Sequence, residues 1–130
     1  MNHAQNHMQM LVNGLAAEHK KDRAKTQMTL GGLIDRLQEL DQSMQMEGIY
    51  AGHSYRGYYS DLAFERCESR EVGGVLDAIK ACMGETFEGY KGGDFDMGRN
   101  TPVWIANYGS CGTRIMAVND DGSIVTADEE

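Results

Sequence analysis

The chain has 130 residues and a mass of 14.4 kDa, which fits one compact domain. Its residues are 41% hydrophobic and 25% charged, an ordinary globular composition that argues against a disordered chain or a fibre. A formal net charge of −8 argues against sequence-independent binding to duplex DNA or to an anionic membrane, so we expect neither nucleic acid nor a membrane as a partner. The sequence has no apolar run of about 18 residues and no secretory signal pattern, which predicts a cytoplasmic protein.

Residues 1–27 differ in composition from the rest of the chain. They carry three of the four histidines and no aromatic residue, and their basic residues outnumber their acidic residues, whereas the remainder is strongly acidic. Five residues of this segment recur at helical spacing: Met8, Leu11, Val12, Leu15 and His19. We therefore expect an amphipathic helical arm at 1–27, which packs either on its own domain or on another subunit, and a single domain at 28–130.

Two helices are predicted within the domain. Thr29 can cap the first, whose apolar residues repeat at helical spacing: Leu30, Leu33, Ile34, Leu37 and Leu40. Asp41 and Ser43 end this helix. The second helix starts after Ser69 and stops at Gly84, and its apolar positions are Val72, Val75, Leu76, Ile79 and Met83.

The two predicted helices resemble each other in sequence. Residues 31–37 align with residues 73–79 at an offset of 42, and the alignment preserves a glycine pair, an aspartate and the apolar positions. This similarity suggests two copies of a helix-plus-two-strands unit, although two weak repeats can also match by chance.

The remaining apolar segments are typical of strands. Besides a strand near Phe87, we expect strands at 44–51, 59–66, 102–108, 112–118 and 123–126. The last two form a hairpin around the turn 119–122. Together these elements predict an α+β fold, in which a mainly antiparallel sheet carries the helices on one face.

No catalytic motif is recognisable in the sequence. Residues 28–130 contain a single histidine, His53, and lack the GxSxG, HExxH and P-loop patterns of common enzymes. Asp94 and Asp96 could act as an acid–base pair, but adjacent acids in a glycine-rich loop more often form turns. We therefore expect a protein that is not an enzyme and has no cofactor.

The cysteines do not indicate a disulfide framework or a metal site. Cys67, Cys82 and Cys111 are odd in number and widely spaced, with no CxxC pattern and no paired histidines nearby. We expect them to be small buried side chains and expect no metal.

Two loops combine glycine, aromatic and basic residues. The first, at 54–59, contains Arg56, and the second, at 87–94, contains Lys91. Glycine lets backbone N–H groups turn toward a phosphate, a basic side chain neutralises the phosphate, and an aromatic ring offers a stacking face for a base. These are the parts of a nucleotide pocket, although each loop taken alone is more often a hairpin whose aromatic rings pack into the core.

Further residues could complete such a pocket. Asn100 and Asn107 could read a base edge or ribose hydroxyls, and Arg114 lies in a predicted strand from which it could reach a ligand. Arg36 lies opposite the apolar stripe of its helix, where it is either solvated or in contact with a ligand or another subunit. Trp104 lies on an apolar strand and is most simply a core residue, with a stacking role as the alternative.

Several stretches are similar to small phage proteins. Residues 29–40 resemble the opening pattern TLGxLIxxLExL of many such proteins. The runs SYRGYYSDLAFE at 54–65, GYKGGD at 89–94 and TPVWIANYG at 101–109 resemble the rest of one family, the first Thoeris anti-defence family. The resemblance spans residues 29–118, and the basic arm at 1–27 departs from it.

The resemblance implies sequestration of a signalling nucleotide. Proteins of this family bind cyclic ADP-ribose isomers made by bacterial TIR-domain enzymes without cleaving them, and some members also hold cyclic oligonucleotides at a separate site. They form symmetric assemblies in which an aromatic ring stacks on adenine and arginines contact the pyrophosphate. Carried over to this chain, Phe87 or Tyr90 would stack on adenine and Arg114 would contact phosphate, with Arg36 and Asn100 as weaker matches.

The residues that the two arguments together assign to ligand binding are Phe87, Tyr90, Lys91, Asn100, Asn107, Arg114, Arg56 and Arg36. The expected protein is a homo-oligomer in the cytoplasm of an infected bacterial cell, with a small cyclic nucleotide as its ligand. The alternative is an inhibitor that binds protein, whose acidic surface mimics nucleic acid and blocks a host nuclease or a CRISPR effector.

Overall fold

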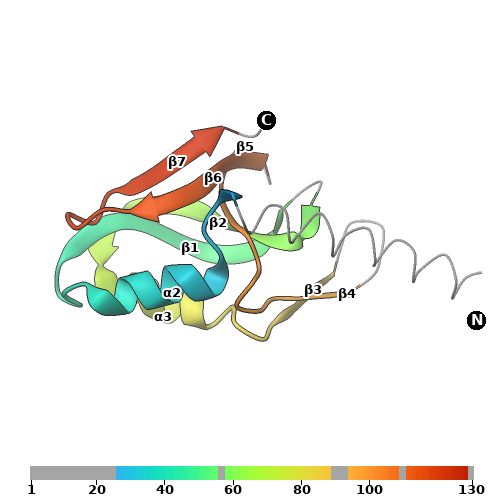
Figure 1. Ribbon diagram of the computed structural model, residues 1–130, viewed down its shortest axis with the longest axis horizontal. Helices are drawn as coiled ribbons and strands as arrows, with labels where there is room; N and C mark the ends of the chain where they lie inside the picture. Colours follow the sequence, from blue (N-terminus) through green and yellow to red (C-terminus); the bar gives the residue numbers. More distant parts are fainter. Residues whose placement is uncertain (1–25, 56–57, 89–93, 109–110, 129–130) are drawn as a thin grey trace, which may run out of the picture.

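The computed structural model describes residues 26–55, 58–88, 94–108 and 111–128 (Figure 1). Its elements in chain order are the helix α2 (Leu30–Glu39), the strands β1 (Gln45–Tyr55) and β2 (Tyr58–Glu71), the helix α3 (Val72–Lys80), and the strands β3 (Thr86–Glu88), β4 (Asp94–Asp96), β5 (Val103–Tyr108), β6 (Cys111–Val118) and β7 (Ile124–Asp128). The helical arm predicted at 1–27 lies outside the described residues except for its last two positions, so it stays a prediction.

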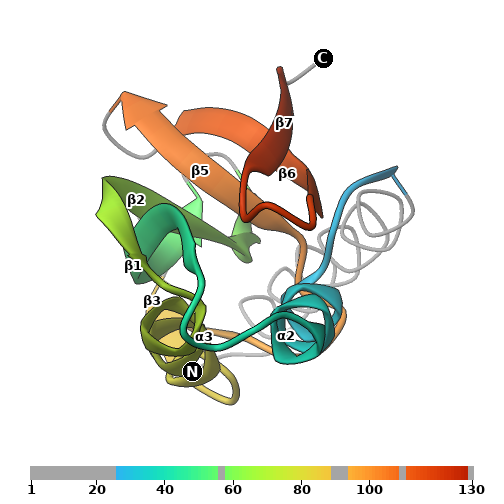
Figure 2. The same ribbon diagram turned by 90° about the vertical axis from the view of Figure 1, so that its left-hand side faces the viewer.

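Five of the strands form one sheet in the order β1-β2-β5-β6-β7. Neighbouring strands in it are antiparallel except β2 and β5, which are parallel, and β3 and β4 pair as a separate two-stranded ribbon. Figure 2 shows both helices on one side of the main sheet. The prediction of an α+β fold with a mainly antiparallel sheet and helices on one face is confirmed.

Helix α2 begins where its sequence predicts. The Thr29 hydroxyl oxygen accepts a hydrogen bond from the Gly32 N–H (3.2 Å), which is an N-cap. The apolar stripe is buried, as the periodicity predicts: Leu30, Leu33, Ile34 and Leu37. Leu40 follows the helix and is half-buried against the same core.

The first turn of α2 docks on the segment 99–101, which leads into β5. The Leu30 N–H donates to the Thr101 carbonyl (2.7 Å). The Gly31 N–H donates to the Arg99 carbonyl (3.0 Å), and a Cβ at Gly31 would lie 2.8 Å from Arg99 Cβ. The close contact therefore requires glycine at this position. The N–H groups of Leu30 and Gly31 donate to backbone carbonyls, so they are not available to bind an anion.

The first turn of α3 docks in the same way on the segment between α2 and β1. The Val72 N–H donates to the Met44 carbonyl and the Gly73 N–H donates to the Gln42 carbonyl, both at 2.9 Å. A Cβ at Gly73 would lie 3.3 Å from the Gln42 carbonyl oxygen. The first glycine of the pair thus serves the same packing role in each of the two helices.

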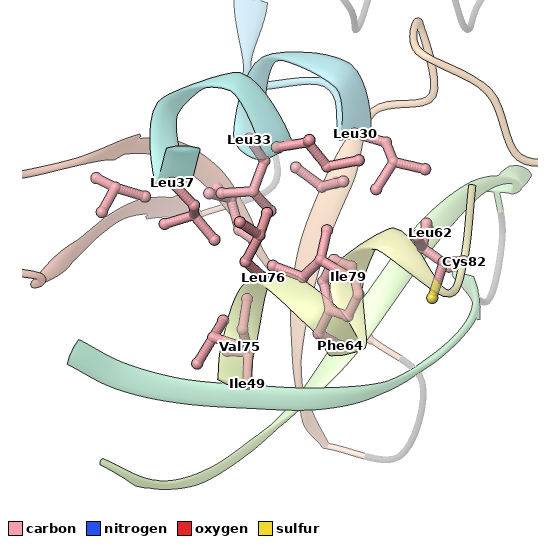
Figure 3. Close-up of a cluster of buried hydrophobic side chains, with 14 of the residues drawn as sticks. Leu30, Leu33, Leu37, Ile49, Leu62, Phe64, Val75, Leu76, Ile79 and Cys82 are labelled. Atoms are coloured by element: carbon pink, nitrogen blue, oxygen red, sulfur yellow. The ribbon is translucent and has the colours of Figure 1, made fainter. Parts of the chain in front are cut away.

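The core fills the space between the helices and the sheet. Figure 3 shows the leucines of α2 directed toward Leu76 and Ile79 of α3, with Val75 close to Ile49 of β1. Burial of an aliphatic side chain of this size stabilises a fold by about 1.5–3 kcal/mol. This helix-side core is almost wholly apolar and holds the sheet in place beneath the helices.

The strands differ from the sequence-based expectation in two respects. The β1–β2 hairpin is longer at both ends than predicted, because β1 pairs with β2 along its whole length from Gln45 to Tyr55. Residues 94–96 form a strand where we expected a loop, because they pair with β3. The duplicated unit is not reproduced by the pairing, since β1 pairs with β2 whereas β3 pairs with β4 and not with β5. In the part of the chain that the structure describes, no helix has the length and apolar character needed to cross a bilayer.

Candidate functional site

The central strand β5 contributes side chains to two separate buried clusters. Val103 and Ile105 join the helix-side core, whereas Trp104 and Ala106 belong to a second cluster, as the alternation of a strand requires. We call the side of the sheet away from α2 and α3 the second face. The second-face cluster also contains Tyr55, and the centre of this face is buried: Trp104 and Tyr55 are each 1% exposed.

One transverse row of the second face crosses all five strands. From β1 to β7, strand register places in it His53, Ala63, Trp104, Arg114 and Ala127. Directly opposite residues of neighbouring strands point to the same face, so the half-buried Arg114 lies beside Trp104. A cationic side chain and an indole ring are therefore adjacent on the second face.

Tyr55 is the last residue of β1, and its side chain extends across the second face. Its ring stacks on the Trp104 indole, with 4.1 Å between centroids and 19° between planes. Its hydroxyl oxygen accepts a hydrogen bond from the Gly112 N–H (3.1 Å) and its O–H points to the Gly112 carbonyl (3.4 Å). Tyr55 thus reaches from the edge strand over the centre of the sheet to β6.

Two register shifts bend β1 so that Tyr55 can reach that position. They fall between Tyr50 and His53 and between Ser54 and Tyr55. Within the first of them Ala51 has a φ of +53°, the left-handed conformation that side chains other than glycine rarely adopt. The bend therefore carries local backbone strain, which the contacts of Tyr55 must offset.

Asp61 anchors the indole from the neighbouring strand. It is fully buried, and its Oδ2 accepts a hydrogen bond from Trp104 Nε1 at 2.8 Å. A carboxylate in an apolar interior is costly unless it accepts hydrogen bonds, and here the bond fixes the tilt and position of the ring.

The row ends at β1 in a partly exposed polar pair. His53 Nε2 lies 3.0 Å from Glu65 Oε1, with the two side chains 31% and 42% exposed. Glu65 is in turn the register partner of Ala106 in the second-face cluster. The second face therefore combines stacked rings, carboxylates, a guanidinium and a histidine, the groups that bind a polar aromatic ligand.

Arg114 is the predicted ligand-binding residue that belongs to this arrangement. Phe87 is half-buried on β3 and packs against the helix-side core, and Asn100 is exposed in the turn before β5. The side chain of Asn107, on β5, is outside the described set, and so are all of Arg56, Tyr90 and Lys91. The described candidates thus lie in different places, and their roles toward a ligand stay predictions.

Arg36 acts as a clamp between α2 and the β6–β7 turn. Its Nε donates to the Val118 carbonyl (2.9 Å), one terminal nitrogen donates to Asp120 (2.6 Å), and the other lies 3.4 Å from Glu39. The hydrogen bond to Asp120 is the largest cause of a raised pKa of Arg36. The structure therefore gives this residue a packing role at the end of the molecule where helix and hairpin meet.

The sequence analysis included Tyr55 in the aromatic loop at 54–59 without naming it among the ligand-binding residues, and it did not single out Asp61. It considered stacking by Trp104 only as an alternative. The expectation that Trp104 is buried is confirmed. Asp61 carried a signal that could have found it, because a lone acid stands beside the apolar run 62–64. The stack of Tyr55 on Trp104 could not be predicted in this way, because the position of Tyr55 depends on the bend in β1.

The cysteines with described side chains match their expected role in part. Cys82 is buried, and burial is the main cause that raises the pKa of its thiol, whereas Cys67 is half-buried. Within the described residues, no group of three or more histidine, cysteine or acidic side chains is placed to hold a metal ion. No protein-family model, curated protein or solved structure gives a significant match to this protein.

Proposed function

We propose that this protein binds and sequesters a small nucleotide of the cyclic ADP-ribose type without cleaving it. The observation that carries the proposal is the placement of Arg114 beside Trp104, with the buried Asp61 carboxylate bonded to the same indole. Such a ligand carries an adenine, ribose hydroxyls and a pyrophosphate. An aromatic ring matches the base, and a guanidinium matches the phosphates.

The proposal takes its ligand class from the resemblance to the first Thoeris anti-defence family. Sequestration requires tight binding and slow release, and a ligand closed into a ring loses little conformational freedom when it binds. Charge-assisted contacts to both phosphates would add to that affinity. We further propose that the protein acts as a homo-oligomer in the cytoplasm of an infected bacterial cell.

The test begins with thermal unfolding of the full-length protein with and without cyclic ADP-ribose isomers. A sequestering protein melts several degrees higher with one of them, because a ligand that binds only the folded state stabilises it. Chromatography of the ligand released by heating must then recover it intact. Recovery of an altered ligand would mean that the protein is an enzyme, and no shift with any cyclic nucleotide would overturn the proposal.

Variants locate the site. Arg114→Ala should lower the affinity for the ligand at least tenfold while the fold stays intact. Arg70→Ala is the matched control, because Arg70 lies at the end of β2 away from Asp61 and Ala63, with its guanidinium 5.2 Å from the centre of the Tyr50 ring. Phe87→Ala tests the stacking role that the resemblance implies. Unchanged affinity in both the Arg114 and the Phe87 variant would place the pocket elsewhere.

A second candidate function is supported by an exposed group of carboxylates where α2 meets the β6–β7 turn. Arg36 links Glu39 to Asp120, and Glu47 accepts a hydrogen bond from the Ile124 N–H (2.8 Å) at the same end. Such a surface fits an inhibitor that binds a nuclease or a CRISPR effector in place of nucleic acid. That protein would melt higher only with its protein partner and not with a nucleotide.

A further inference from the structure

The second face has a floor of small residues at its centre. Ala63, Ala106 and Gly112 occupy neighbouring positions on β2, β5 and β6, and the indole of Trp104 stands among them. Larger side chains at these positions would fill the space over the sheet. Instead the ring of Tyr55 fills it, entering from the end of β1.

The contacts of Tyr55 are those that a heterocyclic base would make. One face of its ring is stacked on an indole, and its polar end meets the backbone N–H and the backbone carbonyl of a single residue, Gly112. Adenine offers a flat face together with a ring nitrogen that accepts and an amino group that donates at one edge. A donor and an acceptor from one backbone residue are therefore complementary to that edge.

The position of Arg114 extends the match to a phosphate. Gly112 and Arg114 are two residues apart on β6 and share the second face, which separates them by about 7 Å along the strand. If the edge of a base is bonded to Gly112, the sugar and phosphate of the same nucleotide lie within reach of the Arg114 side chain.

From this arrangement, and resting on the proposed function, we infer that Tyr55 occupies the base subsite of the protein and that the adenine of the ligand displaces it. The ring of Tyr55 is an internal substitute for the base. The strained bend at Ala51 makes the displaced arrangement accessible, because release of Tyr55 also lets the bend relax.

Trp104 reports directly on this exchange, because it is the single tryptophan of the sequence. The full-length protein and its Tyr55→Ala variant are titrated with AMP while Trp104 emission is followed. We expect the variant to bind AMP at least tenfold more tightly than the wild type, because the wild type must first expel its own ring. Tyr50→Ala, an exposed tyrosine of the same strand, is the matched control and should bind AMP as the wild type does.

A second probe separates a base subsite from a simple packing defect. p-Cresol carries the ring and hydroxyl that Tyr55→Ala deletes, with one extra methyl group, and should bind Tyr55→Ala in competition with AMP. Binding of p-cresol without any binding of AMP would show a core cavity only and would overturn the inference. AMP affinity in Tyr55→Ala equal to or below that of the wild type would overturn it as well. If circular dichroism shows that the alanine variant does not fold, Tyr55→Leu takes its place under the same criteria.

Cyclic ADP-ribose distinguishes this inference from the function on which it rests. In the wild type, calorimetric heat and a change of Trp104 emission should saturate together. Heat without a change of emission would leave the sequestration proposal standing and overturn the role of Tyr55. If no cyclic nucleotide produces heat, the proposed function fails, and the AMP comparison between wild type and variant alone decides the role of Tyr55.

Discussion

The helix side of the sheet and the centre of the second face are both buried, but they are buried by different kinds of contact. The helix side is covered by two amphipathic helices whose leucines, valines and isoleucines interlock without directional bonds. The second face is covered in part by the end of the sheet's own hairpin, where Tyr55 stacks on Trp104 and bonds Gly112, and the Trp104 N–H in turn donates to Asp61. Apolar packing tolerates substitutions that preserve volume, whereas a directional arrangement depends on each partner. We therefore expect stability to depend mainly on the first face and recognition mainly on the second.

The largest effect should come from the helix side. Leu33 is fully buried in α2, so Leu33→Ala should lower the free energy of unfolding by about 3 kcal/mol, through lost transfer energy and the cavity left behind. Urea unfolding measures this loss. Nucleotide affinity of the folded fraction should be unchanged, and a change would mean that the two faces are not independent. Leu40→Ala, at a half-buried position, is the milder control.

Removal of the carboxylate on the second face should have the next largest effect. Asp61→Leu deletes the acceptor of the Trp104 N–H and should cost about 2 kcal/mol, because the exchange leaves a buried donor without this bond. Asp61→Asn keeps an acceptor oxygen and should cost clearly less. Unlike the Leu33→Ala variant of the helix side, Asp61→Leu should also shift Trp104 emission in the folded protein. An unchanged spectrum would show that the carboxylate does not position the ring.

The docking of the helices can be tested with one pair of glycines. Gly31→Ala should destabilise the protein by about 1–3 kcal/mol. The new Cβ would lie 3.0 Å from the backbone Cα of Arg99, which cannot move aside as a flexible side chain could. Gly74→Ala meets nothing within 4 Å and should stabilise the protein by about 0.5 kcal/mol through helix propensity. If thermal unfolding shows that Gly31→Ala lowers stability and Gly74→Ala raises it, the first glycine of the shared pair is the one required by close contact. Equal effects would contradict it.

The bend that covers the second face should respond to side-chain shape at Ala51. Ala51→Val places a β-branched residue at positive φ and should cost about 1 kcal/mol, although the position is exposed. Gln45→Val, at an exposed position of the same strand without positive φ, is the control and should be near neutral. A neutral Ala51→Val would mean that the bend is not strained.

The smallest effect concerns two aspartates in turns. Asp41 accepts hydrogen bonds from Ser43, and Asp121 accepts them from Ser123, which lowers the pKa of both carboxyls from the ordinary value of an aspartate. Because the folded pKa lies below the unfolded one, the stabilisation is present above about pH 4 and disappears as the pH falls through the folded pKa. Unfolding experiments between about pH 5 and pH 2 should show this decline. It should be shallower in the Asp41→Asn, Asp121→Asn double variant, and an identical slope would contradict the assignment.

The helices and most strands could be predicted because their signals are local. Thr29 and the leucine repeat are enough to define α2, and the turn 119–122 is enough to define the last hairpin. The bend in β1 and the strand β4 could not be predicted, because both depend on pairing partners outside the segment itself. For the site, the sequence indicated Arg114 and the aromatic loop at 54–59, but it indicated neither the stack of Tyr55 on Trp104 nor Asp61.

By itself the sequence determined the α+β class, the helix-side apolar faces and the burial of Trp104, because hydrophobic periodicity is a property of neighbouring residues. Only the tertiary structure decided what shares the second face with that indole. Strand order and register bring Asp61, Arg114 and Gly112 together from two strands, and the bulges in β1 add Tyr55. The physical reason is that register is set by which strands meet and where a ladder slips, and neither is encoded in any one segment of the sequence.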